Sequence, residues 1–180
     1  YAIARRQVET FETGLLKEWP ATGPAVVWTA TGLGSGYGSM AIAGDRVYLQ
    51  AAVGRNSGLV ALNRADGKVL WAKGVGPAAA NDKGGGPRST PTVDGDRLYV
   101  VTSDGRIACL TTDDGEVVWS QEFRQWGGRM MSGWGYSESP LVDGEAVIVV
   151  PGSNDAMMVA LNRRTGDVLW KAAMPSDVGT

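Results

Sequence analysis

Five side chains have the chemistry of a recognition site, and all come from two glycine-rich segments, 84–90 and 127–139. A guanidinium can hold a carboxylate through two parallel hydrogen bonds, and an indole or phenol ring offers a flat stacking face. The sequence therefore predicts a surface that binds a protein or a small-molecule ligand. Its candidate residues are Arg88, Arg129, Trp134, Tyr136 and Glu138.

A structural role for the same side chains is the alternative. In that case Arg88 and Glu138 pair with neighbouring parts of the fold, and the aromatic rings only plug a channel. The remaining acidic residues stand mostly in glycine-containing turns, where Asp side chains cap the backbone. They are therefore interpreted as turn residues, and no catalytic residue or metal ligand is predicted in this chain.

Several kinds of chemistry are excluded by residues that the chain lacks. It contains no His, so a Ser-His-Asp triad or a His-ligated zinc site cannot be built from it. Its single thiol, Cys109, cannot form an internal disulfide and is expected in the core. The run 84–86 is followed by Pro87 rather than Lys-Ser or Lys-Thr, which argues against a nucleotide site. A net charge of −2 argues against a nucleic-acid partner.

The elements that must position these residues form an internal repeat. Three strand-turn-strand units each end in Gly, any residue, Val, an aliphatic residue and Trp, and the Trp spacings are 48 and 51 residues. A second apolar strand pair, joined by a Gly-containing turn, precedes each unit. The motif residues are Gly67 and Trp71, Gly115 and Trp119, and Gly166 and Trp170.

A period of roughly 50 residues with four short strands per unit predicts an all-β β-propeller of four-stranded antiparallel blades. The blades are expected at approximately 37–75, 87–124 and 136–175. The strand that ends at Trp28 is a fourth copy of the last strand, without three strands before it. The chain is thus predicted to be an incomplete arc of about three blades plus one N-terminal strand. We divide it into an N-terminal arm, 1–23, and a partial propeller, 24–180.

The rest of the ring is expected outside this chain. Propellers need at least four blades, so a parent protein of roughly 350–420 residues is predicted from seven or eight repeats. The N-terminus has no apolar stretch of a signal peptide, and no apolar run approaches the roughly 20 residues that cross a bilayer.

The string Ala-Leu-Asn-x-x-x-Gly-x-Val-Leu-Trp, at 61–71 and 160–170, resembles the tryptophan-docking motif of PQQ-like repeat propellers, a WD40-like architecture. The resemblance covers about residues 24–175. That family includes quinoprotein dehydrogenases and also non-catalytic bacterial propellers, among them the propeller lipoprotein of the outer-membrane β-barrel assembly machinery. The resemblance therefore specifies the fold more closely than the activity.

Three functional hypotheses remain, and the repeat together with the absence of assembled catalytic groups favours the first; its compartment is what the resemblance implies. The first is a non-catalytic binding or scaffold module of a larger exported bacterial protein, periplasmic or extracellular, with no cofactor in this chain. The second is part of a PQQ- and calcium-dependent dehydrogenase of alcohols or sugars, with PQQ and calcium bound in the full-length protein. The third is a sensor or adhesive ectodomain fused to other domains.

Overall fold

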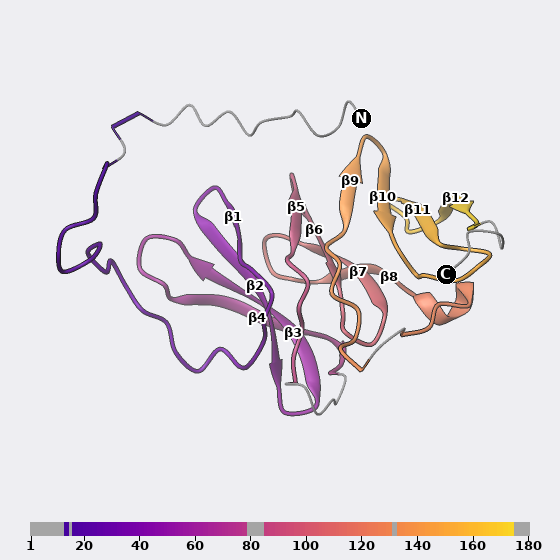
Figure 1. The fold of residues 1–180 in the computed structure, drawn as a ribbon, viewed down its shortest axis with the longest axis horizontal. Coiled ribbons are helices and arrows are strands. Elements are labelled where there is room, and N and C mark those ends of the chain that lie inside the picture. Colours follow the sequence, from indigo (N-terminus) through magenta and orange to yellow (C-terminus); the bar gives the residue numbers. More distant parts are fainter. Residues whose placement is uncertain (1–12, 15, 79–84, 131–132, 175–180) are drawn as a thin grey trace.

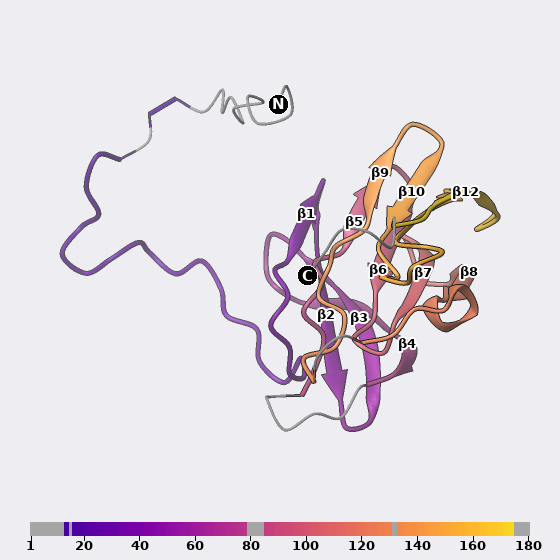
Figure 2. The ribbon, with the colours of Figure 1, turned by 45° about the vertical axis from the view of Figure 1, so that its right-hand side comes forward.

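The computed structural model describes residues 13–14, 16–78, 85–130 and 133–174, and these form three four-stranded antiparallel sheets. In each sheet the strands are paired in chain order, and the three sheets stand side by side as an open arc (Figure 1). This confirms the predicted all-β fold of four-stranded blades. The described part of the N-terminal arm leads away from the sheets (Figure 2).

The first blade is the longest. It comprises β1 (Ala41–Ala43), β2 (Arg46–Val53), β3 (Asn56–Asn63) and β4 (Val69–Pro77). The turn between β1 and β2 places Gly44 at φ +58°, in the left-handed region that glycine tolerates. An added β-bridge joins Ser35 to Ala52, so the loop before β1 lies against the end of β2.

The second and third blades repeat this plan with shorter strands. The second contains β5 (Thr92–Asp94), β6 (Arg97–Val101), β7 (Arg106–Thr111) and β8 (Val117–Glu122), and a 3-10 helix, η2 (Phe123–Trp126), follows it. The third contains β9 (Leu141–Asp143), β10 (Ala146–Val149), β11 (Met158–Asn162) and β12 (Val168–Ala172).

The innermost strands β1, β5 and β9 are neighbours in space and form the hub of the arc. Side-chain hydroxyls connect them one to the next. The backbone N–H of Ser39 donates to Thr90 Oγ1 at 3.2 Å, and the N–H of Thr90 donates to Ser139 Oγ at 3.0 Å. Thr92 Oγ1 donates to the carbonyl of Pro140 at 2.5 Å.

The hydrophobic core lies in the seams between blades. In the first seam Leu59 and Ala61 of the first blade pack against Leu98 and Val100 of the second. In the second seam the cluster includes Tyr99, Val101, Ile107, Val147, Val149 and Leu161. Both faces of β6 and β7 are therefore covered, which explains why their sequences are apolar without strict alternation.

Three tryptophans each contact the turn between the last two strands of the following blade, which is the β3–β4, β7–β8 or β11–β12 turn. The indole N–H donates to a turn carbonyl, and the ring lies on the turn glycine so closely that a Cβ there would come within 2.7 Å of it. Trp28 donates to the carbonyl of Arg64 at 2.8 Å, Trp71 to that of Thr112 at 3.2 Å, and Trp119 to that of Arg163 at 3.1 Å. The glycines beneath are Gly67, Gly115 and Gly166.

The fourth copy of the last strand, residues 24–28, is not assigned as a strand. Val26 and Val27 are 77% and 85% exposed, and among the described residues no strand pairs with this segment. Only Trp28 is held, through its contact with the first blade. At the other end of the arc, Trp170 is 43% exposed, compared with 9% for Trp119.

Candidate functional site

The centre of the candidate site is a guanidinium placed between two aromatic rings. Arg88 Cζ lies 4.8 Å from the centroid of the Tyr37 ring and 5.2 Å from that of the Trp134 ring. The three residues come from the loops that precede β1, β5 and β9, so each blade supplies one of them. A cation over an aromatic face gains about 0.5–2 kcal/mol, depending on how far it is desolvated.

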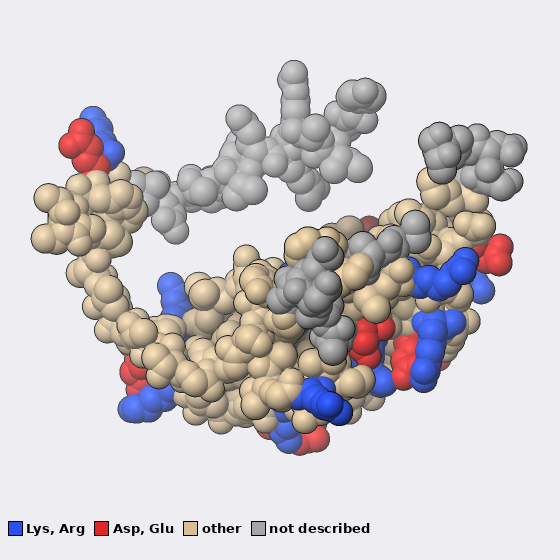
Figure 3. All heavy atoms as spheres, turned by 60° about the horizontal axis from the view of Figure 1, so that its bottom comes forward, with Lys and Arg blue, Asp and Glu red and all other residues tan. Residues whose placement is uncertain are grey.

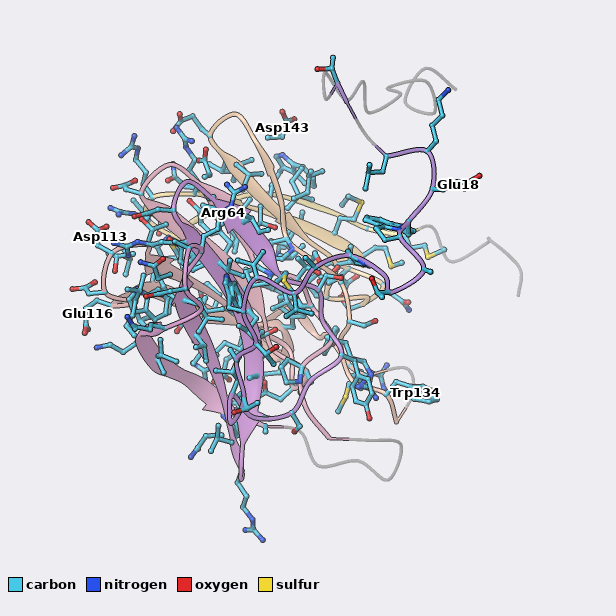
Figure 4. All side chains as sticks on the ribbon, turned by 90° about the vertical axis from the view of Figure 1, so that its left-hand side faces the viewer. Glu18, Arg64, Asp113, Glu116, Trp134 and Asp143 are labelled. Atoms are coloured by element: carbon cyan, nitrogen blue, oxygen red, sulfur yellow. The ribbon has the colours of Figure 1, made fainter. Side chains whose placement is uncertain are left out.

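Both rings remain accessible to a partner. Tyr37 is 65% exposed and Trp134 is 49% exposed. Figure 4 shows Trp134 projecting from its loop away from the sheets. Met130, from the same segment as Trp134, is also 49% exposed. We call Tyr37, Arg88, Met130 and Trp134 the mouth surface.

Among the described residues, few charges are visible near the middle of this side of the molecule. The loops before β1, β5 and β9 run along the lower side of the arc in Figure 1, which Figure 3 turns toward the viewer. In Figure 3, Lys, Arg, Asp and Glu gather mainly along the rim, and a broad area of other residues separates them. Such a charge-depleted centre with aromatic residues is typical of the core of a protein interface.

The other three candidate residues line a neighbouring hollow of about 290 Å³. Arg129, Tyr136 and Glu138 form part of its wall, together with Met130 and Met157. The structure thus divides the five candidates into two groups. Met130, from the same segment as Trp134, also lines this hollow.

Tyr136 is held by the surrounding fold. Its hydroxyl donates to the carbonyl of Pro151 at 3.1 Å, and its ring lies on Gly105. The ring also packs edge-on against Phe123, with centroids 4.9 Å apart. Burial raises the pKa of the phenol, with a smaller contribution from the Glu138 carboxylate. These contacts give Tyr136 the space-filling role that the structural alternative describes.

Glu138 has a partner in its own blade. Its Oε1 accepts a hydrogen bond from the backbone N–H of Val150 at 2.9 Å. Burial raises the pKa of this carboxyl, and the hydrogen bond from Val150 opposes that shift only in part. Arg129, by contrast, is exposed at the rim of the hollow.

Sequence reasoning did not select Tyr37 or Met130 as candidates. Tyr37 stands two residues before Ser39, just as Arg88 stands two residues before Thr90, and Ser39 and Thr90 occupy the same place in the repeat. The equivalent positions of Tyr37 and Arg88 in the repeat could have identified Tyr37 as a candidate from the sequence. The contact itself depends on three loops meeting at the hub, which no single repeat reveals.

The part of the chain that the structure describes contains no assembled metal-binding group and no accessible thiol. No three His, Cys, Asp or Glu side chains there are grouped to hold a metal ion. Cys109 is fully buried, and burial raises the pKa of its thiol to about 11. The described ranges also contain no helix long and apolar enough to cross a bilayer.

Comparison with known proteins assigns the family. The family model described as outer membrane protein assembly factor BamB matches residues 6–82 and 55–179, which together span nearly the whole chain. This chain belongs to the BamB family of PQQ-like β-propellers. Two copies of the family model overlap on it, as expected of a repeat protein.

Among curated relatives, BamB of Salmonella typhimurium is 36% identical over 70 residues, which are 39% of this chain and 15% of that protein. BamB of Alteromonas naphthalenivorans is 23% identical over 99 residues, which are 51% of this chain and 24% of that protein. The matched parts therefore span less than a quarter of these relatives.

Solved structures show the same architecture. BamB from Moraxella catarrhalis superposes with a TM-score of 0.59 at 21% identity, covering 82% of this chain and 39% of that one. A europium-containing methanol dehydrogenase superposes with a TM-score of 0.55 at 17% identity, covering 78% of this chain and 25% of that one. At these identities the similarity establishes the fold alone.

Proposed function

We propose that this chain is part of a non-catalytic β-propeller that binds a protein partner through the mouth surface, and that it serves in outer-membrane protein assembly. The observation that carries the proposal is the Tyr37–Arg88–Trp134 contact. It presents two exposed aromatic rings around one arginine at the junction of three blades.

The choice of a protein partner follows from the composition of the mouth surface. Arg, Tyr, Trp and Met are enriched in protein interfaces, and the energetically dominant residues cluster near the centre. Because Arg88 is braced by two rings from other loops, its side chain has lost conformational freedom before a partner arrives. Less entropy is then lost on binding.

The assembly role and the compartment come from the family. The relatives are named as outer membrane protein assembly factors. We extend that role to this chain, and with it a location in the periplasm, where such a factor meets its clients. Tight association of a repeat scaffold with its partner does not require any catalytic group in these blades.

Site-directed photo-crosslinking tests the proposal in the full-length protein in its own cells. A photoreactive phenylalanine analogue at position 37 or 134 is expected to crosslink to a component of the outer-membrane assembly machinery. The matched control is position 70, because Leu70 is 45% exposed on the outer strand β4, away from the hub. Equal crosslinking at position 70, or none at 37 and 134, contradicts the proposal.

An enzyme assay addresses the dehydrogenase alternative. Full-length protein supplied with PQQ and calcium should give no dye-linked oxidation of alcohols or sugars. Turnover that depends on both additions would overturn the non-catalytic assignment, whatever the crosslinking shows.

A further inference from the structure

Polar side chains replace apolar ones at one end of the seam between the first two blades. Gln50 on β2 and Ser57 on β3 lie on the blade face that also carries Tyr48 and Leu59, which pack toward the second blade. The register pairs Gln50 with Leu59 and Ala52 with Ser57, so the two polar side chains are diagonal neighbours. Gln50 is 3% exposed and Ser57 is 0% exposed.

Arg106 approaches the same place from the second blade. Its neighbour on the same face of β7 is Ala108, which belongs to the first seam, so Arg106 also faces the first blade. Arg106 Nε lies 3.2 Å from the position that a Cβ on Gly76 would occupy, and Gly76 is the register partner of Ser57. The guanidinium therefore lies beside the Ser57 end of the seam.

Four polar atoms in this cluster have no hydrogen-bond partner among the residues that the structure describes. They are both Nε2 and Oε1 of Gln50, Oγ of Ser57 and Nε of Arg106. A buried amide or hydroxyl group that loses its partners costs about 1–3 kcal/mol. Native proteins satisfy such groups, and ordered water is the ordinary partner when the protein offers none.

The charge of the cluster selects a neutral ligand. Arg106 Nη2 is 2.5 Å from Glu122 Oε1, and Nη1 donates to Ser120 Oγ at 3.3 Å. Glu122 thus balances the guanidinium on its outer side, and no anion is needed on the inner side. The unpaired amide group of Gln50 and hydroxyl group of Ser57 can bind a neutral molecule that both donates and accepts hydrogen bonds.

In the second seam, apolar side chains occupy the corresponding space. There Val101 and Ile107 are covered by the rings of Phe123 and Tyr136, all in one hydrophobic cluster. Gln50 stands in the first blade where Val101 stands in the second, because each lies two residues after the tyrosine that faces the next blade. Both seams contain a Tyr–Trp pair, Tyr48 with Trp71 in the first and Tyr99 with Trp119 in the second, so the difference between the seams lies elsewhere, at Gln50 and Val101.

We propose that Gln50, Ser57 and Arg106 form an internal water-binding site in the seam between the first and second blades. The bound water joins the two blades by accepting from the Nε–H of Arg106 and exchanging hydrogen bonds with Gln50 and Ser57. This proposal does not depend on the proposed function.

Direct observation of water is the first test. In a high-resolution crystal structure of the full-length protein, ordered water is expected within about 2.7–3.2 Å of Gln50 Nε2 or Oε1 and of Ser57 Oγ. Water in solution should also give dipolar cross-peaks to the Gln50 side-chain amide protons, with a residence time far longer than that of surface water. A dry seam in which both side chains bond directly to protein groups overturns the proposal.

Substitution is the second test and uses the unfolding equilibrium of the full-length protein. With water bound, Gln50→Leu should raise the unfolding equilibrium constant roughly five- to tenfold, since it removes hydrogen bonds from a satisfied network. Without water, the same change removes two orphaned groups and should leave the constant unchanged or lower it. Ser57→Ala, which cannot clash, should act in the same direction.

Non-additivity of the two substitutions distinguishes a shared water from two unrelated effects. The double variant should be less destabilised than the product of the single effects predicts, because either change alone already disrupts the common water. Val101→Leu serves as the matched control in the apolar second seam and should leave the water signal of Gln50 unaltered. Loss of that signal in the control would contradict assignment of the water to the first seam.

Discussion

At the scale of single residues, burial determines which candidate side chains can carry charge. Glu138 is half-buried, and its carboxylate accepts a hydrogen bond from the Val150 N–H. Since burial raises the pKa of Glu138 above its ordinary value of 4.5, the folded protein holds this proton more tightly than the unfolded chain does. Proton linkage then favours the folded state in acid.

Substitution of Glu138 should therefore have a pH-dependent effect on stability. The stabilising contribution of the proton is complete below about pH 4.5 and is lost as the pH rises through the elevated pKa of the folded state. Glu138→Gln keeps an acceptor for Val150 and carries no charge. We expect it to raise the urea midpoint at pH 8 and to leave the midpoint at pH 4 nearly unchanged. An equal effect at both values would show that ionisation of Glu138 is not involved.

At the scale of the elements, a turn and a strand of neighbouring blades form one structural unit. The carbonyl of Thr112 accepts from the indole of Trp71, from the Tyr48 hydroxyl at 3.4 Å and from Arg46 Nη1 at 2.7 Å. Gly115, in the same turn, has φ +72° and supports the Trp71 ring. The turn thus needs glycine both for its backbone conformation and for the contact.

Two glycine substitutions separate the cost of the left-handed backbone conformation from the cost of the contact with the Trp71 ring. Gly144, in the turn between β9 and β10, has φ +56° but open space around it. Gly144→Ala should cost only the left-handed conformation, about 1–2 kcal/mol in the free energy of unfolding. Gly115→Ala should cost roughly 1–3 kcal/mol more, because the new Cβ would lie 2.7 Å from the Trp71 ring. Chemical denaturation measures both, and equal costs would exclude the ring contact as a source of stability.

At the scale of the whole molecule, the arc has two unlike ends. The first blade carries Trp28 on its outer face, whereas the last blade presents Trp170, 43% exposed, beside Leu169 and Val168. The third blade also has Ile148 at the place where the others have Tyr48 and Tyr99, so the hydroxyl that supports each earlier seam is missing here. The apolar end face is the surface on which a further blade would pack.

A comparison of two tryptophans tests whether a further blade follows. In the full-length protein, Trp119→Ala and Trp170→Ala should both lower the free energy of unfolding by about 3–5 kcal/mol, the usual cost of removing a buried Trp. A cost below about 1 kcal/mol for Trp170→Ala, with a large cost for Trp119→Ala, would mean that no blade covers Trp170. Denaturant titration monitored by circular dichroism gives both values.

Much of the fold follows from the sequence because the determinants are local and repeated. Asp143-Gly144 and its counterparts produce tight turns between short apolar strands, and a Trp near the end of each unit is too large to bury within one sheet. These features recur at nearly constant spacing, so they predict blades, their antiparallel order and the open arc. The sequence predicts a strand that ends at Trp28, but residues 24–28 are not assigned as one, because a strand needs a pairing partner and none is found among the described residues.

The candidate site depended on tertiary structure. The sequence identified Arg88 and Trp134, but only the meeting of three hub loops placed Tyr37 against Arg88 and left Arg129, Tyr136 and Glu138 around a separate hollow. The polar end of the first seam likewise cannot be recognised in a single repeat, because Gln50 and Ser57 are ordinary strand residues until the fold buries them between two blades. Local patterns determine strands and turns, whereas contacts between loops are determined by how the blades pack.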